Sequence, residues 1–367
     1  MPDNRAEKTA FIVHPPDAHL FKSYIHFLRP DKSYRNELLI KLFEWTPSYK
    51  VKEFSNLGFN GNTGIDASFI MVPFLPEMRD ISLRQVVEKI DSALEIATSA
   101  GCTVAAMGGF TSIVLQGQER DFAEKHGIRI TSGNSLTATI ILKSIESIAV
   151  RFGIDLSGAS IAIIGASGDI GSACMGYLCT RVKQMYATGR SIYALEEAVN
   201  RHREYMSSDV VITDNNREAI ENSRICIFVT SAYNYLFTVK DFKPGTIVCD
   251  ASAPLNVKVD GPLRDDVFLY HGGVTSIPFP IVAGFDIGLP STYTFYGCQL
   301  EGLLLGLYPD MPCSWGRGNI SCDKLALFFR KFEECASMEI AFSIGNRMYS
   351  DEQMEAYARR WRSGYPG

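Results

Sequence analysis

The chain has 367 residues, 46% of them hydrophobic, and a formal net charge of −5, so two globular domains with a large core are expected. The acidic balance disfavours nucleic acid or an anionic membrane surface as a partner. No apolar run is long enough to span a bilayer, and the charged N-terminus has no apolar signal-peptide core.

The nine cysteines form no C-x-x-C pair, and the six histidines are scattered without the spacing of zinc ligands. An odd number of cysteines, several of them in apolar runs, indicates a reducing cytoplasm and not a disulfide framework. The sequence therefore predicts a cytoplasmic protein without a metal site.

Strand and helix patterns alternate in the first part of the chain. Strands are predicted at 9–13, 69–74, 102–107 and 128–130, and an amphipathic helix at 82–100. A long helix predicted at 135–152 is placed to bridge two domains.

From Ser160 onward the alternation becomes regular. Strands are predicted at 161–164, 184–188, 210–212, 225–229, 246–249 and 267–270, with helix patterns between the first four. This order predicts an α/β fold with a Rossmann-type parallel sheet. The predicted domains are an N-terminal α/β domain (1–155, with the bridging helix), a Rossmann-type domain (156–290) and a C-terminal helical segment (291–367).

Three glycines spaced three apart, Gly165, Gly168 and Gly171, follow the first strand of the regular part and open a helix pattern. Glycines in this place allow a tight turn, a close approach of the backbone to phosphate, and close packing of helix and strand. The residues predicted to bind a dinucleotide are Gly165, Ser167, Gly168, Asp169, Ile170 and Gly171. A glycine-rich turn in an unliganded α/β domain is the alternative.

The end of the next strand predicts which dinucleotide is bound. NAD-binding domains usually carry Asp or Glu there, but this chain has Ala187-Thr188-Gly189-Arg190-Ser191. Arg190 can pair with a 2′-phosphate, so NADPH is predicted; a solvated surface arginine is the alternative. Thr230, Ser231 and Ala232, after a later strand, are predicted to flank the nicotinamide half, although ordinary turn chemistry explains them almost as well.

Cys298 lies early in a predicted helix that follows the dinucleotide domain. A helix N-terminus lowers the pKa of a thiol and raises its thiolate fraction, so Cys298 is a candidate nucleophile. Glu301 is expected on the same helix face. A buried cysteine that packs beside glycines is the alternative.

Several blocks of the chain, in order, resemble the long-chain acyl-[acyl-carrier-protein] reductases of cyanobacteria. The resemblance runs from about residue 74 to about residue 324, and Cys298 falls on the cysteine nucleophile of that family. The matching stretches are Phe74–Met78, Ala106–Ile113, Thr131–Asn134, Gly153–Ser157, Gly165–Ala173 and Ser314–Arg317.

The resemblance implies an NADPH-dependent oxidoreductase of lipid metabolism that reduces an acyl thioester to a fatty aldehyde through an acyl group on Cys298. It implies acyl carrier protein as the thioester donor, with acyl-CoA as a possible substitute, and an aldehyde-consuming enzyme as a further partner. The chain departs from the family pattern before Phe54, at 271–290 and beyond Ile340, so the acyl chain length is not predicted.

Gly109, Ser112, Thr131 and Asn134 are predicted to lie around the substrate, where backbone amides can stabilise an oxyanion; glycine turns between strands are the alternative. Glu77 is a candidate for proton transfer or a helix-start residue. His271 is a candidate proton donor, although the family pattern has no histidine there. The basic segment Arg359–Arg362 is expected to dock an acidic carrier or to be a solvated helix.

Two other kinds of function fit parts of the sequence. An NADP-dependent alcohol dehydrogenase of the shikimate/quinate type shares the two-domain layout, but it needs a lysine–aspartate pair that we do not find in the first domain. A non-catalytic NADPH-binding protein would need no nucleophile. Replacement of Cys298 by alanine separates the alcohol dehydrogenase from a thioester reductase, and an assay of NADPH oxidation with acyl thioesters separates the non-catalytic protein.

Overall fold

The computed structural model describes residues 7–15, 36–59, 64–75, 81–316 and 318–364. Contacts between residues divide the chain into two compact units. The first unit is Met1–Leu136, Thr275–Arg317 and Arg330–Glu339, and the second is Thr137–Val274, Gly318–Phe329 and Ile340–Gly367.

A five-stranded sheet forms the centre of the first unit, in the order β2-β3-β1-β4-β5. Strand β2 is antiparallel to β3, and the other neighbours are parallel. The strands are β1 (Lys8–Val13), β2 (Tyr49–Leu57), β3 (Ile65–Met71), β4 (Cys102–Met107) and β5 (Arg129–Thr131). The strand predicted at 69–74 therefore starts earlier and ends at Met71.

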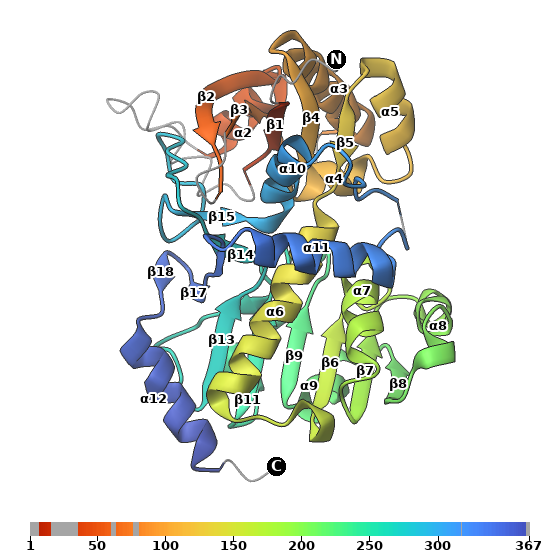
Figure 1. Ribbon diagram of the computed structural model, residues 1–367, viewed down its shortest axis with the longest axis vertical. Helices are drawn as coiled ribbons and strands as arrows, with labels where there is room; N and C mark the ends of the chain where they lie inside the picture. Colours follow the sequence, from red (N-terminus) through yellow and green to blue (C-terminus); the bar gives the residue numbers. More distant parts are fainter. Residues whose placement is uncertain (1–6, 16–35, 60–63, 76–80, 317, 365–367) are drawn as a thin grey trace. The chain divides into compact units, whose positions relative to one another are not determined.

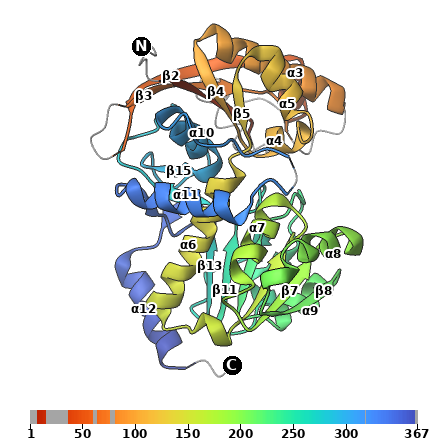
Figure 2. The same cartoon turned by 45° about the vertical axis from the view of Figure 1, so that its right-hand side comes forward.

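Helices α3 (Leu83–Ser99) and α10 (Gly297–Leu307) lie on opposite faces of this sheet, as Figure 2 shows. Alternate residues of β1 explain this, because Ala10 and Ile12 belong to the core under α3 whereas the Thr9 hydroxyl donates to the Gly302 carbonyl of α10 at 2.9 Å. A capping box at Ser82 starts α3 at the predicted place.

Glycines let α10 lie close to the sheet. A Cβ on Gly302 would lie 2.5 Å from the Ala106 Cβ, and one on Gly306 would lie 2.5 Å from the Ile65 Cδ1. The remaining elements of the first unit include α2 (Asn36–Trp45), α4 (Phe110–Val114), α5 (Glu119–His126) and β15 (Thr294–Tyr296).

The second unit contains a parallel six-stranded sheet in the order β13-β11-β9-β6-β7-β8, which is the Rossmann order. Its strands are β6 (Ser160–Ile164), β7 (Gln184–Thr188), β8 (Asp209–Thr213), β9 (Ile225–Phe228), β11 (Thr246–Asp250) and β13 (Val267–His271). The predicted α/β fold with a Rossmann-type parallel sheet is confirmed.

Helices cover both faces of this sheet (Figure 1). Ile161 and Ile163 of β6 pack with α6 (Asn134–Phe152), α7 (Asp169–Leu178) and α8 (Ile192–Asn200), whereas Ala162 and Ile164 pack with α9 (Asn216–Glu221). The other elements are α11 (Cys322–Glu334), β10 (Phe237–Thr238), β12 (Val257–Lys258), β14 (Val274–Ser276), β16 (Glu339–Ile340), β17 (Ser343–Ile344), β18 (Arg347–Met348) and the 3-10 turns Leu156–Gly158, Arg203–Tyr205 and Val239–Asp241.

The last helix, α12 (Asp351–Arg362), is held within the second unit by Trp361, which is 3% exposed and donates to the Gly245 carbonyl at 3.2 Å. Arg360 forms a 2.7 Å ion pair with Asp265, and Arg362 pairs with Glu355. Two of the three arginines expected to dock a carrier thus already have carboxylate partners.

Candidate functional site

The glycine loop of the second unit has the geometry that dinucleotide binding requires. Gly165 has a φ of +99°, and a Cβ there would lie 2.6 Å from the Val229 carbonyl oxygen. A Cβ on Gly171 would lie 2.3 Å from the Gly165 oxygen. Gly168 precedes α7 and provides no side-chain cap, so backbone N–H groups of the first turn can face a phosphate. These residues fit a dinucleotide pyrophosphate.

The side chains of the loop are partly exposed. Ser167 and Ile170 are half-buried, and the Asp169 carboxylate accepts a hydrogen bond from the Gly318 backbone N–H at 2.8 Å. Asp169 therefore links the start of α7 to the segment that begins at Gly318, a contact that the sequence did not indicate.

The end of β7 has no carboxylate. Thr188 donates to the Asn216 side chain at 2.6 Å, Ser191 caps α8, and Arg190 is exposed. Among the described residues, Arg190 makes neither a hydrogen bond nor an ion pair, so its guanidinium can pair with an anion from solution.

Asn256 joins the loops that follow β9 and β11. Its amide oxygen accepts from the Thr230 hydroxyl at 2.5 Å, and its amide nitrogen donates to the Ala232 carbonyl at 2.9 Å. Ser252 accepts from the Thr230 N–H at 3.1 Å, whereas Ser231 is exposed. The network fixes the predicted nicotinamide-flanking residues, but sequence reasoning did not identify Asn256.

Asp250 anchors the second of these loops. Its carboxylate accepts from the backbone N–H groups of Ser252 at 3.1 Å, Asn256 at 2.7 Å and Val257 at 2.8 Å. Burial raises the pKa of Asp250 to about 6, although these hydrogen bonds act in the opposite direction.

Cys298 is the second residue of α10 in the first unit, and its side chain is half-buried. Hydrogen bonds from the backbone N–H groups of Gly109 and Gln299 favour the thiolate, but burial and the nearby Glu301 oppose it. Burial is the largest cause and raises the pKa of Cys298 to about 11. The expected lowering of this pKa by the helix N-terminus is therefore wrong, because desolvation of the sulfur outweighs the backbone donors.

Gly133 lies against the backbone of Cys298. It has a φ of +72°, and a Cβ there would lie 2.1 Å from the Cys298 Cα. The turn at 131–134 can approach the nucleophile this closely only because it carries a glycine.

A buried polar network holds that turn. The Thr131 hydroxyl hydrogen-bonds to Glu301 and accepts from the Ser314 N–H at 3.0 Å. The second Glu301 oxygen accepts from the Leu136 N–H at 2.8 Å, and Glu301 is fully buried. The network joins two sequence blocks of the resemblance, those that begin at Thr131 and Ser314, to Glu301 of α10. The Thr131 hydroxyl is held by these contacts.

The other predicted substrate residues lie in two places. Gly109, with a φ of +56°, precedes α4 and supplies the N–H at the Cys298 sulfur. The Ser112 hydroxyl donates to the Gly109 carbonyl at 2.8 Å, which braces this turn. Asn134 is the half-buried first residue of α6.

His14 follows β1 and was missed in the sequence. Its Nε2 accepts from the Phe110 N–H at 2.9 Å, and its Nδ1 lies 2.8 Å from the Pro15 oxygen, which assigns the proton to Nδ1. Burial lowers the pKa of His14 to about 4, so the ring is neutral near pH 7. His14 thus caps the start of α4 and has no ring nitrogen left to act as a base.

The structure describes one of the two proton-transfer candidates from the sequence. His271 ends β13 in the second unit, and burial lowers its pKa to about 4. Glu77 lies outside the described residues, as does Arg317 of the last matching block.

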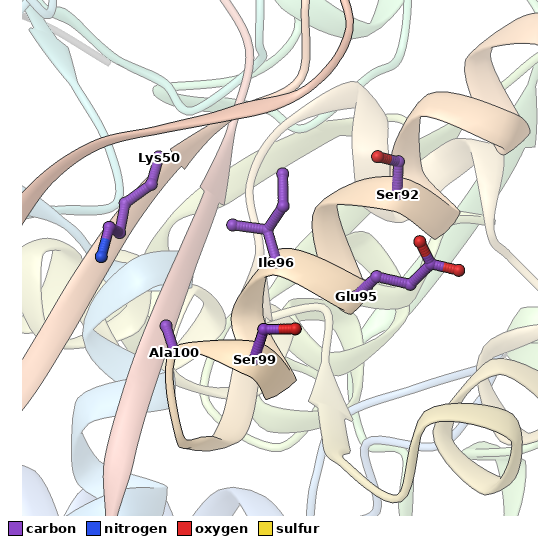
Figure 3. Close-up of a pocket in the computed structure, with 6 residues that line it drawn as sticks. All are labelled: Lys50, Ser92, Glu95, Ile96, Ser99 and Ala100. Atoms are coloured by element: carbon purple, nitrogen blue, oxygen red, sulfur yellow. The ribbon is translucent and has the colours of Figure 1, made fainter.

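Two surface depressions of the first unit contain no part of the Cys298 network. One, of about 390 Å³, is lined by Lys50 of β2 and by α3 residues, on the sheet face opposite to α10 (Figure 3). The other, of about 440 Å³, lies along β5 and α5 and includes Cys313 and Trp315. The described residues contain no group of three His, Cys, Asp or Glu side chains that could hold a metal ion. None of the helices in the described ranges is long and apolar enough to cross a membrane.

Comparison with known proteins gives a distant relative of similar length. A long-chain acyl-[acyl-carrier-protein] reductase of Synechococcus elongatus is 28% identical over 281 residues, which cover 71% of this chain and 79% of that protein. Aminotransferase PigE of a Serratia species is 26% identical over 310 residues, which cover 82% of this chain but 36% of that protein. No protein-family model matches the chain.

Similarities to solved structures are low. One component of the dipicolinate synthase of Bacillus halodurans has a TM-score of 0.30 and 11% identity, with 69% of this chain and 84% of that chain covered. The nucleotide-binding domain of glutamyl-tRNA reductase from Thermoplasma volcanium has a TM-score of 0.28 and 16% identity, with 36% and 84% covered. The sequence comparisons establish a distant relationship of this Rossmann-fold chain to the acyl-carrier-protein reductase.

Proposed function

We propose that the protein is an NADPH-dependent acyl-thioester reductase that forms an aldehyde through an acyl group on Cys298. The observation that carries the proposal is the position of the sulfur, which receives the Gly109 N–H at the start of α10 while Gly133 lies against the Cys298 backbone. The relative of similar length, an acyl-carrier-protein reductase, supports it.

In the first step the Cys298 thiolate attacks the thioester carbonyl carbon. A carbon–sulfur bond to Cys298 forms, the bond to the carrier sulfur breaks, and the carrier leaves as a thiol after taking up a proton. The N–H of Gly109 lies at the sulfur, where a backbone donor can stabilise developing negative charge, and the turn at 131–134 approaches Cys298 through Gly133.

The cofactor site of the proposal is the glycine loop of the second unit. Gly165, Gly168 and Gly171 would hold the pyrophosphate at the start of α7, and Arg190 would hold the 2′-phosphate. Bound NADPH would supply the hydride that, with a proton, turns the acyl group into an aldehyde and frees the Cys298 thiol. Thr230 and Ala232, fixed by Asn256, would border the nicotinamide half.

Mass spectrometry tests the first step. The protein is incubated with a long-chain acyl-CoA or acyl carrier protein and no NADPH, and the expected result is one acyl group on Cys298. Cys298→Ser should remove the adduct, whereas Cys322→Ser should keep it, since Cys322 is an exposed cysteine of the second unit. Absence of an adduct in a folded protein that binds NADPH contradicts the proposal.

Two further measurements address the other functions. An alcohol dehydrogenase would keep its activity when Cys298 is replaced by alanine, and a non-catalytic NADPH-binding protein would show no NADPH oxidation with any thioester. We further propose a cytoplasmic enzyme that takes its acyl group from acyl carrier protein or coenzyme A and passes its aldehyde to a second enzyme.

A further inference from the structure

Two buried polar atoms near Cys298 have no hydrogen-bond partner among the described residues, the Gln299 Oε1 and the Ser132 Oγ. Gln299 is 2% exposed and Ser132 is 5% exposed. Buried polar atoms are almost always hydrogen-bonded, so each of these atoms calls for an explanation. Both belong to residues next to the proposed reaction site in the chain, since Gln299 follows Cys298 and Ser132 precedes Gly133.

The side-chain amide of Gln299 lies against Gly108, the residue before the glycine whose N–H faces the Cys298 sulfur. Its Nε2 donates to the Ile12 carbonyl at 3.3 Å, and a Cβ on Gly108 would lie 2.2 Å from that nitrogen. The sulfur of Cys298 accepts from the N–H of Gly109, the next residue. The bond to Ile12 assigns the nitrogen end of the amide, so the unpaired end is the oxygen.

Ser132 belongs to the turn that contacts the Cys298 backbone through Gly133. Its N–H donates to the Ser314 carbonyl at 2.7 Å, which fixes the backbone and leaves the hydroxyl unpaired. The next residue, Gly133, contacts the Cys298 backbone. An unpaired acceptor thus belongs to the residue after Cys298, and an unpaired hydroxyl belongs to the residue before the glycine that contacts the Cys298 backbone.

The chemistry of these two atoms matches one class of thioester. An amide oxygen can only accept a hydrogen bond, whereas a serine hydroxyl can donate one. A thioester of a pantetheine arm presents a carbonyl oxygen at the reacting carbon and an amide N–H two carbons beyond the sulfur. A simple alkyl thioester presents the carbonyl oxygen alone.

We propose that Ser132 donates to the thioester carbonyl and that Gln299 Oε1 accepts the first amide N–H of the pantetheine arm, so that Gln299 selects pantetheine thioesters. The inference rests on the proposed function, because it places the thioester at Cys298. The selected feature is shared by acyl-CoA and acyl carrier protein.

The test compares two acyl thioesters of the same length. One is the thioester of N-acetylcysteamine. The other has the same structure, except that an ester oxygen replaces the amide N–H. The measured quantity is the rate constant for acylation of Cys298 without NADPH, followed by intact mass. The wild type should react with the amide thioester about 10-fold faster, because the ester leaves a buried acceptor unpaired. Gln299→Met, which keeps the side-chain length without an acceptor, should reduce the ratio to about 1.

Two serine variants separate the roles. Ser132→Ala should slow both thioesters about 10-fold and keep their ratio, because it removes the donor to the shared carbonyl. Ser343→Ala removes another buried serine hydroxyl without a partner among the described residues, in the second unit, and should change neither rate. Alkylation of Cys298 by iodoacetamide at the wild-type rate shows that Gln299→Met keeps the site folded.

The outcomes are distinguishable. A wild-type ratio near 1, or a ratio that is unchanged in Gln299→Met, overturns the assignment of Gln299. An ordered water bound to the Gln299 Oε1 would give this result. Gln299→Met should also slow acyl-CoA and acyl carrier protein by the same factor, and an effect on one donor alone contradicts a contact with the shared arm. No acylation by any thioester refutes the proposed function itself.

Discussion

Replacement of Gly133 by alanine tests how the Cys298 site is built. Two costs add up: the φ of +72° is strained for any residue with a Cβ, and the new Cβ would lie 2.1 Å from the Cys298 Cα and 2.2 Å from its carbonyl oxygen. The backbone strain costs about 1 kcal/mol. Relief of the overlap requires displacement of backbone and costs about 2 kcal/mol more. We expect about 3 kcal/mol of lost stability, measured by urea unfolding.

Gly101→Ala is the matched control. Gly101 belongs to the same unit and has a φ of +79°, but a Cβ there meets nothing within 4 Å. It should cost about 1 kcal/mol and leave the acylation of Cys298 unchanged. The Gly133 variant should also acylate at least 10-fold more slowly, because the sulfur moves relative to the Gly109 N–H. Equal stabilities of the two variants, with wild-type acylation in both, would refute the reasoning.

Three further predictions concern charge. Arg190→Glu should weaken NADPH binding at least 10-fold and leave NADH binding unchanged, by nicotinamide fluorescence, because it places a carboxylate where the 2′-phosphate would lie. Alkylation of Cys298 by iodoacetamide should speed up about 10-fold per pH unit from pH 7 to 9, since the pKa of about 11 lies above that range; a plateau below pH 9 would contradict it. Burial raises the pKa of Asp250 from 3.8 to about 6, so ionisation costs more in the folded protein and stability should fall by up to about 3 kcal/mol between pH 4 and 6. Asp250→Asn should remove that part of the pH dependence, as denaturant unfolding at the two pH values would show.

The parts of the fold that local pattern dictates were predictable. The strand at Gln184–Thr188 was placed to the residue, and α3 begins at the serine that caps it. Strand β2 was not predicted, because it lies at a sheet edge with most side chains exposed and so lacks a clear apolar alternation. The predicted strand at 69–74 ran too far because Val72 to Phe74 are apolar. These residues are buried in the core, but they lie beyond the end of β3.

In the site, the sequence identified the residue types but not their partners. Gly109 and Thr131 both belong to the Cys298 site, but their roles depend on tertiary contacts. Gly109 supplies an N–H to the sulfur, and Thr131 hydrogen-bonds to Glu301. His14 and Asn256 each make long-range contacts that no local motif marks. The predicted lowering of the Cys298 pKa was wrong for the same reason. A helix start can be recognised in the local sequence, whereas the burial of the sulfur depends on the fold of the whole unit.

A pKa of about 11 is compatible with a nucleophile whose task is acyl exchange. Near pH 7 roughly one molecule in ten thousand carries the thiolate, which protects the resting sulfur from oxidation. After attack on a thioester, two thiolates compete as leaving groups, and the one with the lower pKa leaves faster. A solvated carrier thiol has a pKa of about 8.5, so the proposed intermediate expels the carrier and keeps the acyl group on Cys298. The charge of buried Glu301 raises the pKa of Cys298 further and therefore favours the acyl-enzyme at the expense of the free thiolate.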